Sequence, residues 1–128
     1  MEYEELTKRI IGCSYQVFNT LGPGFLESVY ERSLIVELRA AGLLAQPQVG
    51  LDVYYREILV GHFFADIVVE DTVIIELKAI ETLAKIHEVQ LVNYLVATGK
   101  PTGLLINFGP DGVVIRRKVR ELSSISSC

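Results

Sequence analysis

Apolar positions recur with a helical period over the first forty residues. The first set forms a broad stripe and consists of Ile10, Ile11, Tyr15, Val17 and Phe18. This stripe predicts a helix from about Glu4 to Thr20, which the Gly- and Pro-containing residues 21–24 end. The second set consists of Leu26, Val29, Tyr30, Ile35 and Leu38. It predicts a second helix from about Leu26 to Ala41, with Gly42 as its C-cap.

The period changes after Gly42. Val49, Leu51 and Val53 alternate with polar residues, which predicts a strand with one solvent-exposed face. Residues 58–69 and 73–80 are almost continuously apolar and rich in β-branched side chains. Such runs are typical of central strands that are covered on both faces. The short polar segment 70–72 between them predicts that the two strands form a hairpin.

A third helix and two further strands complete the predicted elements. The helix extends from about Leu83 to Thr98, and Gly99 and Pro101 stop it. The strands are Gly103–Phe108 and Val113–Val119, joined by a turn at residues 109–112. The order is helix, helix, three strands, helix, two strands. This order predicts an α/β (α+β) fold with a central mixed β-sheet of about five strands flanked by helices.

Length and composition narrow the class of protein. The 128 residues suit one domain, which we assign to residues 1–122, with residues 123–128 as a flexible C-terminal tail. A mean hydropathy of +0.35 excludes a disordered chain, and no apolar run approaches the roughly 20 residues that span a membrane. An acidic start and two cysteines predict a cytoplasmic protein. The net charge of -4 argues against non-specific nucleic-acid binding but is compatible with a local basic patch.

Charged residues interrupt the two most apolar strands. Asp66 lies in the first, and Glu76 and Lys78 lie in the second. Side chains alternate between faces along a strand, so Glu76 and Lys78 share one face. A turn centred on Asp71 would place Asp66 opposite Glu76 on that face, with Cβ atoms about 4.5–5.5 Å apart.

Two buried carboxylates need a counter-charge. Burying such groups costs several kcal/mol each unless they are paired or bind a metal, and adjacent carboxylates raise one another's pKa. A hard divalent cation such as Mg²⁺ would solve both problems. The alternative is a structural Asp–Lys or Glu–Lys ion pair at the end of the sheet.

The spacing of these charges resembles a known pattern. Asp66, nine intervening residues and Glu76-Leu77-Lys78 match Asp…(Asp/Glu)-x-Lys across a hairpin. The chain thus resembles the PD-(D/E)XK nuclease superfamily, which implies a restriction-endonuclease-like core. Residues 24–30 are similar to the motif of a small bacterial family named GxxExxY. The resemblance covers about residues 5–119, and the one departure is Ala65, where the superfamily has Pro.

The resemblance implies a metal-dependent phosphodiesterase. Asp66, Glu76 and the backbone carbonyl of Leu77 would be ligands of Mg²⁺ (or Mn²⁺), and Lys78 would orient or deprotonate the attacking water. Glu27 would act as a further catalytic residue and metal ligand. The alternative is that Glu27 is an exposed residue near a helix N-terminus, where the helix dipole favours acids.

The resemblance also points to residues on the third helix. Gln90 would contact Lys78, water or phosphate, and His87 and Tyr94 extend its stripe at helical spacing as accessory residues. The alternative for His87 is a surface or capping histidine. Tyr30 is the third accessory candidate, and it is expected to be a packing residue whose hydroxyl bonds to Glu27 or Lys78.

Basic residues on the last strand are the candidate DNA contacts. Arg116, Lys118 and Arg120 share one face and could follow phosphates, although they could equally protect an edge strand. The sequence therefore predicts a DNA nuclease, in which sequence-specific cutting would need a homodimer or a protein partner. The alternative is a non-catalytic nucleic-acid- or protein-binding module on the same fold. A small-molecule phosphatase lacks support because no phosphate-binding glycine loop is present.

Overall fold

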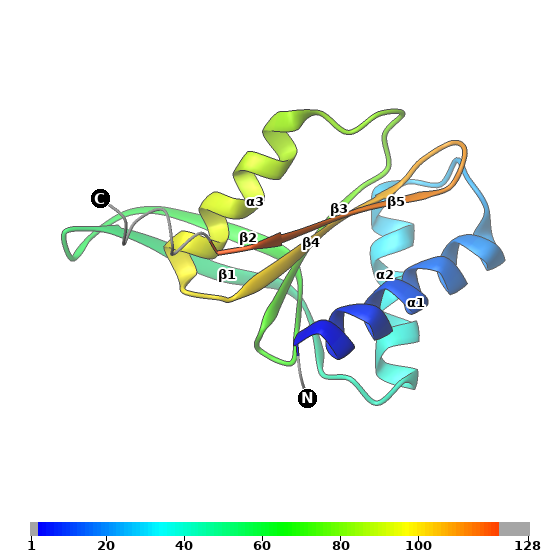
Figure 1. Cartoon of the computed structure of the whole chain (residues 1–128), viewed down its shortest axis with the longest axis horizontal. Coiled ribbons are helices and arrows are strands. Elements are labelled where there is room, and N and C mark those ends of the chain that lie inside the picture. The colour runs from blue at the N-terminus through cyan, green and yellow to red at the C-terminus, as the bar shows by residue number, and fades with distance from the viewer. Residues whose placement is uncertain (1–2, 121–128) are drawn as a thin grey trace.

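The computed structural model describes residues 3–120, which form three helices and five strands (Figure 1). In chain order they are α1 (Tyr3–Leu21), α2 (Glu27–Ala40), β1 (Ala45–Tyr55), β2 (Ile58–Val69), β3 (Val73–Lys78), α3 (Lys85–Thr98), β4 (Thr102–Phe108) and β5 (Val113–Val119). The predicted order of elements is therefore confirmed. The predicted tail at residues 123–128 lies outside the described residues.

The five strands form one mixed sheet in the order β1-β2-β3-β4-β5. β3 and β4 run parallel and α3 connects them, whereas the other neighbouring strands are antiparallel. Helices α1 and α2 cover one face and α3 covers the other (Figure 1). All seven residues of β4 are buried, because this inner strand has helices on both sides. This arrangement confirms the predicted α+β fold class.

The approach of α3 to the sheet depends on Gly103. A Cβ atom at this position would lie 2.8 Å from Cδ1 of Leu91 and 3.1 Å from the carbonyl oxygen of Ile74. Glycine leaves room for the fully buried side chains of Leu91 and Leu95 to pack directly on the strands. This packing sets the height of α3 above β3 and β4.

Two strands differ by more than one residue from the sequence-based expectation. β1 begins at Ala45 and continues to Tyr55, because it pairs with β2 along its whole length. β3 ends at Lys78, two residues early, because the Asn107 side chain bonds to both the amide and the carbonyl of Ile80 at 3.0 and 2.8 Å. The helices that the structure describes include none long and apolar enough to cross a bilayer.

Candidate active site

The two central strands bring the carboxylates of Asp66 and Glu76 together. The pairs between β2 and β3 are centred on Asp71, as expected, and they end with Ile67 opposite Ile75. Beyond that pair the strands separate, and Oδ2 of Asp66 accepts a hydrogen bond of 2.7 Å from the backbone amide of Leu77. The carboxylate thus satisfies an amide that has lost its strand partner.

A bend in the sheet positions Asp66. Strict alternation would place Ala65 and Ile67 on the same face, yet Ala65 packs in the core below α3 and Ile67 packs in the core below α1 and α2. On β1, Gln48 lies between the partners of these two residues and has a positive φ of 49°. Both strands are therefore bent at this level, and Asp66 projects from the bend.

Glu76 has an unusual environment for a carboxyl group. Its Oε1 atom is buried and has no hydrogen-bond partner among the described residues. Burial is the main reason that the pKa of Glu76 is raised to about 8, and the charge of Asp66 adds to the effect, whereas Lys78 opposes it. Without a bound cation, Glu76 therefore retains its proton at neutral pH.

This environment fits a divalent cation with few protein ligands. The unpaired oxygen of Glu76 and the neighbouring Asp66 form a hard oxygen donor pair, which is what Mg²⁺ prefers. Within residues 3–120, three or more His, Cys, Asp or Glu side chains are nowhere clustered as a complete metal site. A cation held by two carboxylates and a backbone carbonyl would keep several waters, as Mg²⁺ commonly does. The ligand roles of Asp66, Glu76 and the Leu77 carbonyl remain predictions.

Helix α3 closes the other side of the site. Glu76 and Lys78 line a cavity of about 70 Å³ together with His87, Gln90 and Tyr94. The structure therefore places the predicted stripe of α3 beside the predicted catalytic strand. The roles of these three side chains in catalysis remain predictions.

Tyr94 and His87 each have a second contact. The Tyr94 ring stacks on Phe63 of β2 with centroids 3.8 Å apart. Partial burial raises the pKa of Tyr94, with smaller contributions from Glu76 and Asp66, so its hydroxyl stays protonated. Nδ1 of His87 accepts a hydrogen bond of 3.0 Å from the amide of Ala84, which confirms the capping role for His87. Sequence reasoning missed Phe63. Its signal in the sequence is its position two residues before Ala65, which places both side chains on the same face of the strand.

The start of α2 faces the carboxylates from the opposite side of the sheet. Partial burial raises the pKa of Glu27, and Asp66 raises it further, whereas Lys78 lowers it. Glu31, one turn later, has its pKa raised mainly by burial and also by Asp66, and its Oε1 accepts a hydrogen bond of 3.0 Å from Gln48. Sequence reasoning missed Glu31, although its spacing of four from Glu27 was a usable signal.

The expected hydrogen bond of Tyr30 to Glu27 or Lys78 is wrong. Its hydroxyl donates to the carbonyl of Gly22 at 2.6 Å and accepts from the amide of Phe25 at 3.3 Å. The side chain is fully buried, which confirms the expected packing role. The hydroxyl belongs to a buried side chain and therefore needs partners, which the backbone of the α1–α2 loop supplies. Tyr30 supports this loop, and an accessory role at the site remains a prediction.

The basic residues of β5 are partly engaged within the protein. Nζ of Lys118 lies 2.6 Å from Oε1 of Glu88 on α3. Arg116 is exposed, whereas the Nε atom of Arg120 is buried and has no partner among the described residues. β5 is an edge of the sheet, so protection of an edge strand and contact with phosphates both remain open for these cations.

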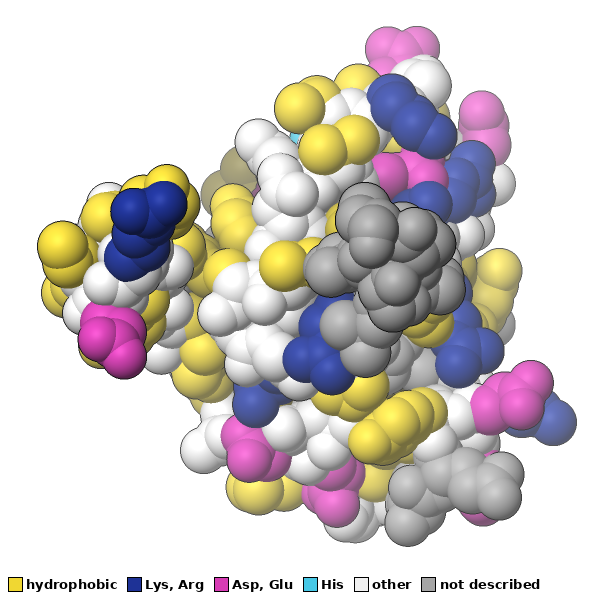
Figure 2. Space-filling view, turned by 60° about the vertical axis from the view of Figure 1, so that its left-hand side comes forward, with side chains coloured by type: hydrophobic (Ala, Val, Ile, Leu, Met, Phe, Trp, Pro, Cys, Tyr) yellow, Lys and Arg dark blue, Asp and Glu magenta, His cyan; other side chains and the backbone are white. Residues whose placement is uncertain are grey.

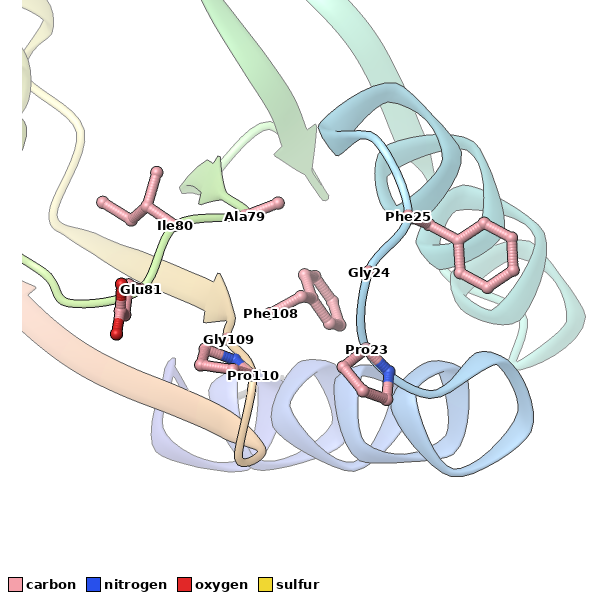
Figure 3. Close-up of a pocket in the computed structure, with 9 residues that line it drawn as sticks. All are labelled: Pro23, Gly24, Phe25, Ala79, Ile80, Glu81, Phe108, Gly109 and Pro110. Carbon is pink, nitrogen blue, oxygen red and sulfur yellow. The ribbon is translucent and has the colours of Figure 1, made fainter.

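A larger cavity lies next to this site. It has a volume of about 570 Å³ and lies between the α1–α2 loop and the segments that follow β3 and β4 (Figure 3). It begins at Ala79, directly after Lys78, but the charged side chain that lines it is a carboxylate, Glu81. This lining does not attract phosphate, so we place the chemistry in the smaller cavity.

Comparisons with known proteins agree with this geometry. A family model of the PD-(D/E)XK nuclease superfamily matches residues 4–121. The solved structure of SSO0001 is similar, with a TM-score of 0.57 and 18% identity over 78% of this chain. This chain spans 53% of the SSO0001 chain.

A second structure, the alkaline exonuclease LHK-Exo from Laribacter hongkongensis, matches with a TM-score of 0.42 and 12% identity. The match covers 89% of this chain and 79% of the exonuclease chain. No curated protein gives a significant match. The narrower GxxExxY assignment remains a prediction. The chain belongs to the PD-(D/E)XK nuclease superfamily.

Proposed function

We propose that this protein is a metal-dependent nuclease that hydrolyses phosphodiester bonds in DNA. The observation that carries the proposal is the pair Asp66 and Glu76, with a buried, unpartnered oxygen on Glu76. Burying a carboxylate oxygen without a partner beside a second carboxylate lowers the stability of the fold, so a purely structural role does not explain it. A bound cation removes this cost.

The residues around the pair have the chemistry that hydrolysis needs. A bound Mg²⁺ or Mn²⁺ would lower the pKa of a water ligand and stabilise negative charge on the phosphate. Asp66, Glu76 and the carbonyl of Leu77 would hold this ion. Lys78, on the same strand face as Glu76, would orient the attacking water or a phosphate oxygen.

Side chains of α3 would complete the contacts to the substrate. Gln90 lies in the cavity with Lys78 and can donate from its amide to a phosphate oxygen. The protonated hydroxyl of Tyr94 can donate in the same way, and its stack on Phe63 limits the positions that the ring can take. His87 already accepts a hydrogen bond through Nδ1, which leaves Nε2 for the cavity.

The charge distribution suggests which surface the DNA would follow. Lys85 at the start of α3 and Lys118 of β5 line one shallow pocket, and Arg116 lies on the same edge strand. Glu88 also lines this pocket and pairs with Lys118, and the three cations outnumber it. We therefore expect the backbone of the DNA to cross α3 and β5, with the scissile phosphate at Lys78.

The non-catalytic alternative makes a distinct structural prediction. It expects the charges to neutralise one another through an ion pair between Lys78 and Asp66. The ion pairs found within residues 3–120 join other residues, and the polar contacts of Asp66 are with the backbone amide of Leu77 and with Glu76. This observation favours the nuclease.

The deciding experiment is cleavage of linear duplex, single-stranded, flap and four-way-junction DNA with Mg²⁺, with Mn²⁺ and with EDTA. Wild type, Glu76→Gln and Glu81→Gln are purified identically. Glu81→Gln is the matched control, because it makes the same chemical change five residues later in the neighbouring cavity. We expect metal-dependent cutting by wild type and by the control, and none by Glu76→Gln. Equal cutting by Glu76→Gln would refute the proposed site.

A further inference from the structure

The end of the β1–β2 hairpin is apolar and uncovered. Residues 54–60 are all exposed, and five of these seven are large hydrophobic residues with exposed fractions of 54–66%: Tyr54, Tyr55, Ile58, Leu59 and Val60. Figure 2 shows this end as a lobe, at the left, that stands apart from the rest of the molecule. Exposed apolar patches of this kind usually mark interaction sites.

Both faces of the hairpin end carry these side chains. Tyr54 pairs with Leu59, and Tyr55 pairs with Ile58. Successive pairs point to opposite faces, so neither face is polar. The helices of the described chain give no cover here, because residues 54–60 belong to neither apolar core. A two-stranded ribbon in water is marginally stable, so this hairpin end would gain stability from a partner.

The two edges of the sheet differ in their protection. β5 carries Arg116, Arg117 and Lys118, and such charges discourage pairing with another strand. The outer half of β1, from Val49 to Tyr55, carries only Asp52, which bonds to Nδ1 of His62 at 2.7 Å. β1 therefore presents an edge with little charge, interrupted by the bulge between Val53 and Tyr54. An edge strand can pair in antiparallel fashion with a copy of itself about a two-fold axis.

The charges at the tip favour a second copy of the chain over a nucleic acid. Arg56 and Glu57 form the two-residue turn, so the hairpin end has no net charge. In a two-fold arrangement, Arg56 of one copy can face Glu57 of the other. A phosphate backbone would require an excess of cations, which this surface lacks. Because each chain has a net charge of -4, two chains repel each other when other parts of their surfaces approach, and the neutral hairpin end avoids this repulsion.

The exposed apolar area of one face approaches the apolar part of a dimer interface. Ile58, Val60 and Phe64 lie an even number of residues apart along β2, and Tyr55 pairs with Ile58, so these four side chains share one face of the ribbon. They are 59–66% exposed and together expose roughly 350 Å². A standard interface buries about 800 Å² per partner, of which about 56–65% is apolar, or about 450–520 Å².

We infer that the end of the β1–β2 hairpin, with the outer edge of β1, is a dimer interface for a second copy of this chain. The interface lies outside the proposed catalytic cavity, and its formation does not depend on cleavage. A two-fold dimer would place two catalytic sites in one particle.

Sedimentation velocity over about 1–200 μM of the full chain tests the inference. We expect wild type to reach twice the mass of one 14.3 kDa chain. Ile58→Lys should raise the dimer Kd by about 100-fold or more, because it buries a charge in each half of the interface. Val36→Lys on α2 is the matched control, since Val36 and Ile58 are both 66% exposed, and it should leave the Kd unchanged. A monomeric wild type, or a dimer unaffected by Ile58→Lys, would overturn the inference.

A charge swap at the tip provides a second test. It changes two exposed turn residues, Arg56 and Glu57, so we expect the variants to fold. Arg56→Glu should weaken the dimer about tenfold, and adding Glu57→Arg should restore it. Thermal melts followed by circular dichroism check the fold of each variant. Anisotropy of a fluorescent oligonucleotide tests the alternative partner. If wild type is monomeric and the hairpin variants lose oligonucleotide binding, the surface belongs to nucleic acid and the dimer is refuted.

Discussion

Replacing Glu76 by Gln should stabilise the metal-free protein at alkaline pH, by an amount that grows with pH. The pKa of Glu76 is raised from 4.5 to about 8, chiefly by burial and then by Asp66. Between these two values the native state binds a proton that the unfolded state has lost, so the free energy of unfolding falls as pH rises. The slope is about 1.4 kcal/mol per pH unit, and the full difference is about 5 kcal/mol. Gln has no proton to lose and avoids this cost.

Urea unfolding followed by far-UV circular dichroism measures the effect, since the chain contains no Trp. Wild type and Glu76→Gln should have free energies of unfolding within about 1 kcal/mol at pH 4.5 and diverge steadily up to about pH 8. Glu81→Gln should follow wild type at every pH. Parallel profiles for wild type and Glu76→Gln would show that Glu76 ionises normally in the native state, and would refute the argument for its environment.

Added metal extends the same experiment. A divalent cation binds the ionised carboxylates, so millimolar Mg²⁺ or Mn²⁺ should raise the stability of wild type most at high pH and flatten its pH dependence. Glu76→Gln should respond much less, because it has lost one of the proposed carboxylate ligands. An equal response in both proteins would place the bound metal elsewhere.

Three further predictions concern residues around the site. Lys78→Ala should lower the rate of DNA cleavage by about 10³-fold or more in a protein that still folds, and full activity would sink the proposed mechanism. Tyr30→Phe should lower the free energy of unfolding by about 1–2 kcal/mol, because the carbonyl of Gly22 loses its donor. The stabilisation by added metal should not change. Urea unfolding with and without metal measures both quantities. Lys118→Ala should weaken DNA binding for all sequences alike and reduce the slope of log K against log salt concentration by about one. Anisotropy titrations over a range of salt concentrations measure this slope. An unchanged slope would mean that Lys118 pairs with Glu88 and does not contact a phosphate.

Local patterns in the sequence were sufficient for much of the fold. The period of apolar residues predicted all eight elements in order, and the length of the turn around Asp71 predicted the register of β2 with β3. The same period placed Glu76 and Lys78 on one strand face and His87, Gln90 and Tyr94 on one helix stripe, which the structure brings together in one cavity. These features depend on residues a few positions apart, so the local order of the chain encodes them.

Contacts between distant segments decided what the pattern could not predict. Ala65 and Ile67 pack on opposite faces because β2 bends beside Gln48, and an alternation rule places them on the same face. Tyr30 bonds to Gly22 because its buried hydroxyl needs a partner and the α1–α2 loop supplies one, although spacing suggested Glu27. Helical spacing alone does not show which of two neighbouring polar groups a side chain will satisfy.

By itself, the sequence determined the order of elements, the strands that carry the charges and the helix that faces them. Only the tertiary structure decided that Glu76 has an oxygen with no partner among residues 3–120, that Tyr94 stacks on Phe63, and that the hairpin end is exposed. The physical reason is that burial and hydrogen bonding depend on which distant segments meet. Periodicity reports the direction of a side chain relative to its own backbone, and carries no information about what lies opposite.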